Sequence, residues 1–218
     1  MYINRAEKFC LGLILLSLAI AIYLYPLMPD RMASHWNAQG QVDGYMSKFL
    51  GLFIMPTISI FLFLLFLAIP RIDPLKENIT KFRKNFDIFV VLVLLFLFYL
   101  FVLTIIWNFG VRFSMILALV PAFVGLFYYV GILVENAKRN WFIGIRTPWT
   151  ITNEAVWNRT HKRGGKLFKI AALIAVFGML FEDYALWFVV VPILLFSGYL
   201  IAYSYFEYQK ELSKKKKK

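Results

Sequence analysis

The sequence is poor in charge and in the residues that most enzymes use. Charged residues make up 17% of its 218 residues, whereas an average soluble domain carries roughly 25%. It has one Cys and two His, so an internal disulfide is excluded. Cys10 lies at the start of the first apolar run and is not placed like a lipid-anchored cysteine that follows a signal peptide. We expect a buried, inert thiol.

The apolar runs have no ionisable residue in mid-run. Pumps and ion-coupled transporters place Asp, Glu, His or Arg within the membrane as ion sites or relays, whereas Asp87, Glu182 and Asp183 lie at the ends of the runs. The chain also contains no HExxH or GxSxG motif and no Cys/His cluster with metal-ligand spacing. These absences argue against proton-coupled transport and against metal-dependent or serine hydrolases. They leave a passive pore open.

Long apolar runs dominate what is present. The chain is 61% hydrophobic with 23 Phe, and several runs approach the roughly 20 residues that cross a bilayer as a helix. We therefore predict an all-α integral membrane protein with six transmembrane helices. The first run resembles a secretory signal but lacks a small-x-small cleavage site, so we predict that it is retained. The expected helices are Phe9–Tyr25, Phe49–Ile69, Phe86–Trp107, Ser114–Val134, Leu167–Phe181 and Ala185–Tyr205.

The distribution of basic residues predicts the orientation. With both termini in the cytoplasm, 21 of the 24 Lys and Arg residues lie on the cytoplasmic side, and Arg31, Lys48 and Arg112 lie outside. This asymmetry is what the positive-inside rule requires of a multi-pass cell-membrane protein. The rule also accounts for the net charge of +12, so we expect no direct contact with nucleic acid. The Lys214–Lys218 tail is expected to be attracted to lipid headgroups.

Four units follow from this topology. Residues 1–70 form a two-helix unit with an extracytoplasmic loop at 26–48, and residues 71–134 hold the third and fourth helices. Residues 135–166 form a cytoplasmic loop with a short interfacial helix. Residues 167–218 hold the last two helices and the basic tail. Within the spans, Pro56 is tolerated because neighbours re-satisfy the freed carbonyl, and Gly125 and Gly131 can bring another backbone close.

The outer loop offers a small polar and aromatic set. Its candidate residues are His35, Trp36, Asn37, Gly40, Asp43 and Tyr45. In one interpretation they form a binding site. In the other they form a structured cap, in which Asp30, Asn37 and Asp43 bond nearby backbone groups while the aromatic rings lie at the headgroups. A metal bound by Asp30, His35 and Asp43 is a third alternative, although this ligand spacing matches no standard site.

The cytoplasmic stretch Asn140–Gly165 is the longest segment that is not simply hydrophobic. Gly144 and Pro148 interrupt any helix that continues from the fourth span. We expect Thr152 to cap a short amphipathic helix, Asn153–Arg163, which Gly164 and Gly165 end.

Helical spacing puts Glu154, Trp157 and His161 on one face of that helix. Three interpretations remain open. The helix anchors the bundle at the headgroups while Arg146 bonds lipid phosphate. Alternatively, Arg146, Trp149, Trp157 and His161 form a docking surface for a cytosolic protein. A membrane enzyme that uses His161, Glu154 and Arg146 is the third.

Both stretches resemble known sequence motifs. The cytoplasmic stretch resembles the SdpI family of bacterial immunity proteins, on the residues Asn140, Gly144, Ile145, Arg146, Thr147, Pro148, Trp149, Thr150, Trp157, Thr160, His161, Gly164 and Gly165. The outer stretch is similar to a short domain of unknown function often found at the N-terminus of that family. Its matching residues are Pro29, His35, Trp36, Asn37, Gly40, Asp43, Gly44 and Lys48.

The resemblance implies a function without catalysis or a cofactor. It implies protection of a producing cell against a secreted antimicrobial peptide, and signalling through a transcriptional repressor held at the membrane. The outer residues would then face the peptide toxin. The cytoplasmic residues Asn140, Gly144, Arg146, Thr147, Pro148, Trp149, Trp157 and His161 would face the repressor, with membrane lipids as the other partner. A small-molecule or lipid transporter or channel, which uses helix gaps at Pro56 and Pro121, is the alternative from a different class.

Overall fold

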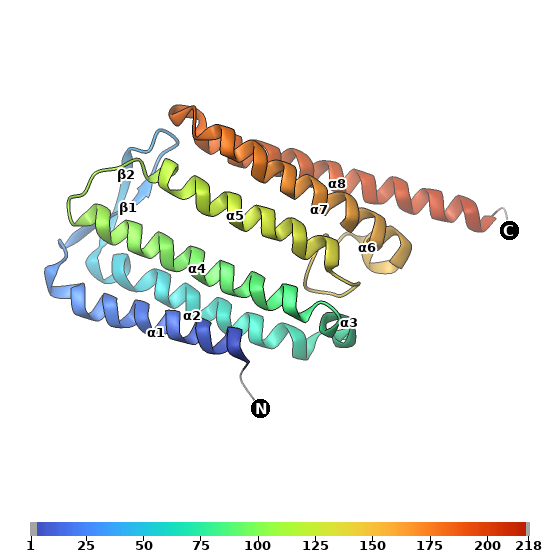
Figure 1. The fold of residues 1–218 in the computed structure, drawn as a ribbon, viewed down its shortest axis with the longest axis horizontal. Coiled ribbons are helices and arrows are strands. Elements are labelled where there is room, and N and C mark those ends of the chain that lie inside the picture. The colour runs from blue at the N-terminus through green and yellow to red at the C-terminus, as the bar shows by residue number, and fades with distance from the viewer. Residues whose placement is uncertain (1–3, 217–218) are drawn as a thin grey trace.

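The structure is a computed structural model that describes residues 4–216 as a bundle of long helices with one β-hairpin (Figure 1). The long helices are α1 (Arg5–Leu24), α2 (Lys48–Ile72), α4 (Arg83–Asn108), α5 (Met115–Asn136), α7 (Glu154–Gly178) and α8 (Ala185–Lys216). Short helical segments are η1 (Tyr25–Leu27), α3 (Lys76–Thr80), α6 (Pro148–Thr152) and η2 (Glu182–Tyr184). The strands are β1 (Arg31–Trp36) and β2 (Val42–Ser47).

Within residues 4–216, five helices are long and apolar enough to cross a membrane, so the prediction of a mostly helical membrane protein is confirmed. They are Arg5–Leu27, Lys48–Ile72, Arg83–Asn108, Met115–Asn136 and Glu182–Lys214. The predicted span Leu167–Phe181 covers the C-terminal half of α7 and the three residues after it, and α7 is not among the five. The N-terminal half of α7 carries Arg159, Lys162, Arg163 and Lys166, which lower the hydropathy of the helix as a whole.

The predicted break at Gly164–Gly165 is wrong, and with it the short separate interfacial helix. Helix α7 runs without interruption through both glycines. A Cβ on Gly165 would overlap the Glu135 side chain and the Gly131 carbonyl oxygen, and a Cβ on Gly131 would overlap the Gly165 carbonyl oxygen. The glycines therefore allow the backbones of α5 and α7 to touch, as small residues do between membrane helices. An ion pair from Lys169 Nζ to Glu135 Oε2 (2.5 Å) joins the same helices.

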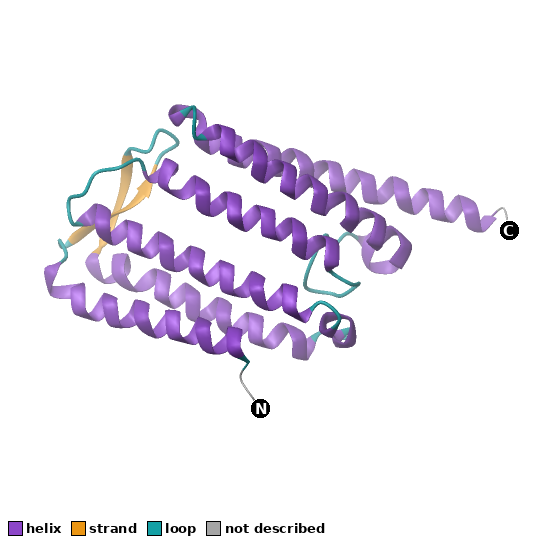
Figure 2. Ribbon diagram, viewed as in Figure 1, coloured by secondary structure: helices purple, strands orange, loops and turns teal. Residues whose placement is uncertain are grey.

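The outer stretch, expected to be a polar loop, contains an antiparallel β-hairpin (Figure 2). Arg31 pairs with Ser47 at its base and Trp36 with Val42 at its tip, with register shifts around His35. The hydrogen bonds between the strands satisfy backbone groups that would otherwise be left unpaired beside the apolar helix ends. Ser47 then caps α2 by accepting a hydrogen bond from the Leu50 backbone N–H (3.4 Å).

The hairpin and the segment that joins α5 to α7 lie at opposite ends of the bundle (Figure 1). We call these the hairpin end and the loop end. Three clusters of buried apolar side chains hold the helices together: one near the loop end between α1, α2, α4 and α7, one under the hairpin, and one between α5, α7 and α8. Cys10 is fully buried in the first, as predicted.

Candidate functional site

The hairpin is fixed to the bundle by a side chain of α4. Asn108 accepts a hydrogen bond from the Ala33 backbone N–H (2.8 Å) and donates one to the Ala33 carbonyl oxygen (3.0 Å). Ala33 and Met32 are fully buried, and Met32 packs with Leu52 of α2 and Phe101 of α4. The first half of β1 is therefore buried against the bundle on both of its faces.

The tip of the hairpin is a tight turn built around Asn37. Its Oδ1 accepts hydrogen bonds from the backbone N–H groups of Gln39 (3.0 Å) and Gln41 (2.9 Å). Gly40 has φ +76°, a left-handed conformation that glycine adopts at low cost. Trp36 packs edge-on against Trp107, with 5.6 Å between ring centroids. For Asn37, the predicted backbone-capping role is confirmed.

Three predicted residues remain on the surface of this framework. Nδ1 of His35 lies 2.5 Å from Oδ1 of Asp43, and the two side chains are 71% and 46% exposed. Tyr45 is also exposed, with the Arg31 guanidinium 5.8 Å from its ring centroid. We call His35, Asp43 and Tyr45 the hairpin set. Asp43 bonds a side chain here, which differs from the backbone cap expected of it.

The proposed metal ligands do not come together. The Asp30 carboxylate pairs with Lys48 Nζ (2.9 Å) at the base of the hairpin, and this contact lowers the pKa of Asp30. His35 and Asp43 pair near the tip. Within residues 4–216, no group of three His, Cys, Asp or Glu side chains is arranged to hold a metal ion.

At the loop end, Asn140 organises the chain that leaves α5. It is fully buried, and its Nδ2 donates to the carbonyl oxygens of Lys138 (2.8 Å) and Ile143 (2.9 Å). Its Oδ1 accepts from the backbone N–H groups of Phe142 (2.9 Å) and Ile143 (2.6 Å). Every polar atom of this side chain is therefore used inside the loop.

Trp157 and His161 form a buried stack one turn apart on α7. Their ring centroids lie 3.8 Å apart, and both side chains are almost fully buried. The indole N–H of Trp157 donates to the Ala137 carbonyl oxygen (2.8 Å). His161 Nδ1 lies 2.9 Å from the Trp157 carbonyl oxygen, and its Nε2 accepts from the Ile145 backbone N–H (3.0 Å).

These bonds define one neutral form of His161, with the proton on Nδ1. Burial disfavours the charged imidazolium and lowers the pKa of His161 from 6.5 to about 4. Gly144 makes the arrangement possible, because its φ is +116° and a Cβ there would overlap His161 Nε2. Gly144, Trp157 and His161 of the motif are therefore one packing unit.

The remaining motif residues join the loop to α8. Thr147 caps α6 in a reciprocal capping box with Thr150, which contributes both its backbone N–H and its hydroxyl. The Thr147 hydroxyl lies 3.0 Å from that of Ser204 on α8. Pro148 begins α6, and Trp149 packs edge-on against Tyr205, with 5.2 Å between centroids.

The predicted N-cap of helix α7 is wrong. The N-cap of α7 is Asn153, which accepts hydrogen bonds from the Ala155 and Val156 backbone N–H groups. The Thr152 hydroxyl, expected to be the cap, instead donates back to the Pro148 carbonyl oxygen (2.7 Å). An Asn at this position competes well with Thr as an N-cap.

The predicted docking surface is divided by burial. Arg146 is exposed and donates to the Trp141 carbonyl oxygen (2.7 Å), and Trp149 is half-buried. Trp157 and His161 are inside the protein. The enzyme alternative also fails at His161, because backbone groups occupy both ring nitrogens and leave none to act as a base.

Sequence reasoning missed the partners that hold this loop. The Asp73 carboxylate, at the end of α2, accepts from the Trp141 backbone N–H (2.8 Å) and is itself buried. Asn78 of the α2–α4 connection donates to the Arg139 carbonyl oxygen (2.8 Å). A single Asp before Pro74 in a basic segment was the available signal. It gave no indication of a partner 68 residues away.

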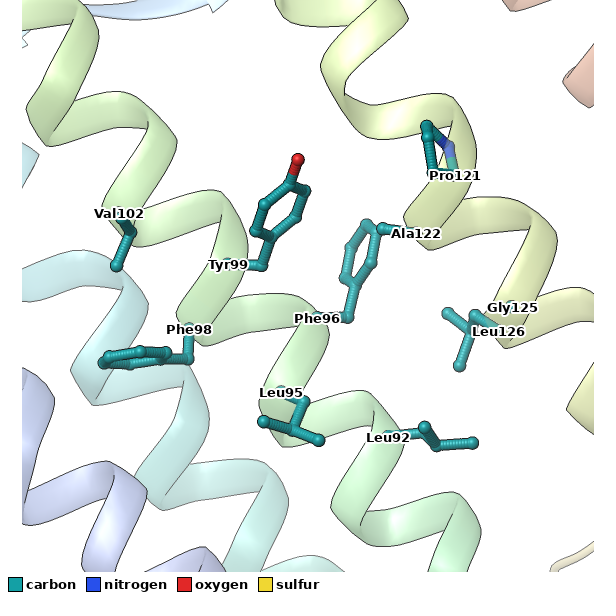
Figure 3. Close-up of a pocket in the computed structure, with 10 residues that line it drawn as sticks. All are labelled: Leu92, Leu95, Phe96, Phe98, Tyr99, Val102, Pro121, Ala122, Gly125 and Leu126. Carbon is teal, nitrogen blue, oxygen red and sulfur yellow. The ribbon is translucent and has the colours of Figure 1, made fainter.

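An apolar groove lies between α4 and α5 (Figure 3). Its volume is about 440 Å³, and its walls include Leu92, Phe96, Pro121 and Leu126. Tyr99 provides a hydroxyl, but it donates to the Ala118 carbonyl oxygen (2.9 Å). The groove has the character of a surface for hydrocarbon, and no charged residue lines it.

Comparisons with known proteins agree with both motifs. Residues 136–205 match the model of the SdpI/YfhL protein family, and residues 12–60 match a domain of unknown function, DUF1648. The chain is 27% identical over 200 residues to Immunity protein SdpI of Bacillus subtilis (strain 168), which covers 91% of this chain and 93% of that protein. No solved structure matches. The resemblance inferred from the sequence is thereby confirmed, and the chain is a multi-pass cell-membrane protein that is similar to the SdpI family.

Proposed function

We propose that this protein is an immunity protein that protects its cell against a secreted antimicrobial peptide, and that the hairpin set recognises the peptide. The likeness to Immunity protein SdpI over nearly the whole of both chains supports the immunity function. The exposure of His35, Asp43 and Tyr45 on a rigid framework supports their part in it.

The proposed contact is polar and aromatic. A carboxylate and an imidazole 2.5 Å apart offer hydrogen bonds to a peptide backbone or to polar side chains. Tyr45 offers an aromatic face with a hydroxyl, a combination that is frequent at recognition sites. Because the hairpin is held by Asn108 and by buried Met32, little ordering cost is expected on binding.

We further propose that the chain crosses the membrane six times with both termini in the cytoplasm. The basic residues support this orientation. The C-terminal half of α7 is apolar and packs between α5 and α8, so it would form the short sixth span with its lysines reaching toward the headgroups. The hairpin end would then face outward, and the loop end would face the cytoplasm.

Survival of a sensitive bacterium tests the immunity function. Cells that express this protein are challenged with a secreted toxin peptide of the kind that SdpI-family proteins are expected to oppose, and in parallel with unrelated membrane-active peptides. Selective survival supports the proposal. Equal survival against all peptides indicates a general envelope effect, and no survival with the protein present in the membrane refutes immunity against that peptide.

A signalling role is a second part of the proposal. The exposed Arg146 and the half-buried Trp149 are the members of the predicted docking surface that a cytosolic repressor can reach. Arg146 donates a hydrogen bond to the Trp141 carbonyl oxygen, and Trp149 packs against Tyr205. Neither side chain contacts Asn140 or His161 through a hydrogen bond. Loss of repressor recruitment in Arg146→Ala, with protection retained, would separate signalling from immunity. Unchanged recruitment would remove Arg146 from this role.

A further inference from the structure

Four basic side chains of α7 form one line on its surface, which we call the basic stripe. They are Arg159, Lys162, Arg163 and Lys166, spaced so that helical geometry places them on one face. Together with Tyr203 of α8 they line a hollow of about 200 Å³. The motif and the proposed immunity function make no use of this hollow.

The charges of the basic stripe are only partly neutralised. Arg159 is paired, because its Nε lies 2.6 Å from Glu207 Oε2 and its Nη2 lies 2.8 Å from Glu211 Oε1. In the part of the chain that the structure describes, Lys162, Arg163 and Lys166 have no acidic partner. The hollow therefore keeps an excess of positive charge, which favours an anion.

Arg163 is held in place by two aromatic side chains of α8. Its Nε (3.3 Å) and Nη2 (3.0 Å) donate to the Tyr199 hydroxyl oxygen. The guanidinium also lies 5.8 Å from the ring centroids of Tyr199 and Tyr203. An arginine that is pre-positioned in this way loses less freedom when it binds a phosphate.

The surface next to the basic stripe is apolar and exposed. On α7, the same face continues from Lys166 to Ile170, Leu173 and Phe177, whose side chains are 45%, 57% and 59% exposed. On α8, the position one turn from Tyr199 in the same direction is Leu195, also exposed. Helices α7 and α8 lie side by side along this length (Figure 1).

We propose that the basic stripe and this apolar surface form a binding site for one anionic phospholipid such as phosphatidylglycerol. The phosphate would contact Lys162, Arg163 and Lys166, and an acyl chain would lie over Ile170, Leu173 and Leu195. A soluble phosphate would use the hollow alone and would gain nothing from the adjoining apolar side chains. The continuity of the two surfaces is the reason to choose a lipid.

Native mass spectrometry of the full-length protein in a nonionic detergent tests the site. Phosphatidylglycerol and phosphatidylcholine are titrated separately, and inorganic phosphate is added in excess to the phosphatidylglycerol complex. We expect phosphatidylglycerol to bind about tenfold more tightly than phosphatidylcholine or better, because its net negative charge would meet three basic side chains that have no acidic partner in the described structure. Inorganic phosphate should not displace it.

Matched variants assign the effect to the stripe. The triple variant Lys162→Gln, Arg163→Gln, Lys166→Gln should lose the preference for phosphatidylglycerol. The control variant Lys76→Gln, Lys81→Gln, Lys84→Gln also removes three positive charges, from other exposed lysines at the loop end. It should keep the preference for phosphatidylglycerol. The charge-preserving variant Lys162→Arg, Lys166→Arg should also keep it. If the triple variant does not fold, Arg163→Gln alone should lower the preference several-fold.

Three results would overturn the proposal. Equal affinity of the wild-type protein for the two lipids would show that the basic stripe does not recognise the headgroup charge. An equal loss of the lipid preference in the stripe variant and in the control variant would show that the preference depends on net charge alone. Displacement by inorganic phosphate would show that the hollow takes a free anion and no lipid.

Discussion

The hairpin and the loop at the other end of the bundle carry motifs of similar composition, but their polar side chains differ in burial and in hydrogen-bond partners. In the loop, Asn140 and His161 are buried, and each has backbone partners for its polar atoms. In the hairpin, His35 and Asp43 are paired with each other and face solvent. The loop motif therefore mainly builds the fold, and the hairpin motif leaves chemistry available to a ligand.

The cost of burying polar groups explains this division. A buried polar atom without a hydrogen bond destabilises the folded state by about 1–3 kcal/mol, so a segment that enters the protein needs partners of fixed geometry. Asn140 satisfies four such bonds with the backbone of its own loop. Residues of this kind are intolerant of change even though they touch no ligand. Exposed pairs such as His35–Asp43 contribute little to stability and are free to serve recognition.

The largest loss of stability is expected for Trp157→Ala, at the loop end. This change removes a fully buried ring, its hydrogen bond to the Ala137 carbonyl oxygen and its stack on His161. Large-to-small changes of this kind cost about 3–5 kcal/mol, so we expect a strongly lowered melting temperature and little protein in the membrane. The exposed Trp187 of α8 provides the control. If Trp187→Ala is as damaging as Trp157→Ala, burial is not the cause.

The second prediction concerns the pH dependence of stability that the buried His161 causes. Because the pKa of His161 is about 4 in the folded protein and 6.5 when exposed, the unfolded state takes up the proton first as the pH falls. The stabilising contribution is complete above pH 6.5 and is lost as the pH falls toward 4. The full loss is about 3 kcal/mol by linkage.

Thermal unfolding of the wild-type protein and of His161→Gln in detergent, between pH 7 and pH 4.5, checks this. The His161→Gln protein should lose most of the pH dependence that the wild-type protein shows in this window. An unchanged dependence in His161→Gln would contradict the neutral, buried assignment.

A smaller effect is expected at the hairpin. His35→Ala and Asp43→Ala should each change the free energy of unfolding by roughly 1 kcal/mol or less, as exposed ion pairs do. A double-mutant cycle on purified protein measures the coupling between the two side chains. A coupling well above that range would mean that the pair holds the hairpin together, and the contrast between the two ends would weaken.

The smallest effect is expected for Arg146→Ala. Arg146 is exposed and makes one hydrogen bond to the Trp141 carbonyl oxygen. Surface changes of this kind stay within about 0.5 kcal/mol, so the melting temperature should be nearly unchanged. A large destabilisation would show that Arg146 belongs to the structural network, although it lies at the surface.

The sequence was sufficient to locate the apolar helices and both motifs, because membrane helices are read from length and hydropathy. It was insufficient where tertiary packing determines where a helix ends or whether a side chain is buried. Gly164 and Gly165 look like a helix end in isolation, but both lie inside α7, where Gly165 packs against Gly131 and Gly164 against Ile145. His161 looks available on a helical wheel, but Gly144 brings the Ile145 backbone N–H onto its ring.

The hairpin shows the same limit. The attachment of β1 to α4 uses Asn108, which lies 75 residues after Ala33 in the chain, and the sequence alone does not indicate that these two residues are in contact. The exposed set could be named from residue types, but its separation from the Asn37 turn and from buried Met32 required the structure.

The most direct test of the division is a comparison of two proteins at equal membrane abundance. One carries His35→Ala, Asp43→Ala and Tyr45→Ala, and the other carries Arg146→Ala. Survival of sensitive cells under challenge with the toxin peptide is measured for both. Our account predicts that the hairpin variant loses protection with little change in melting temperature, while Arg146→Ala retains it. Full protection by the hairpin variant would contradict recognition by the hairpin set.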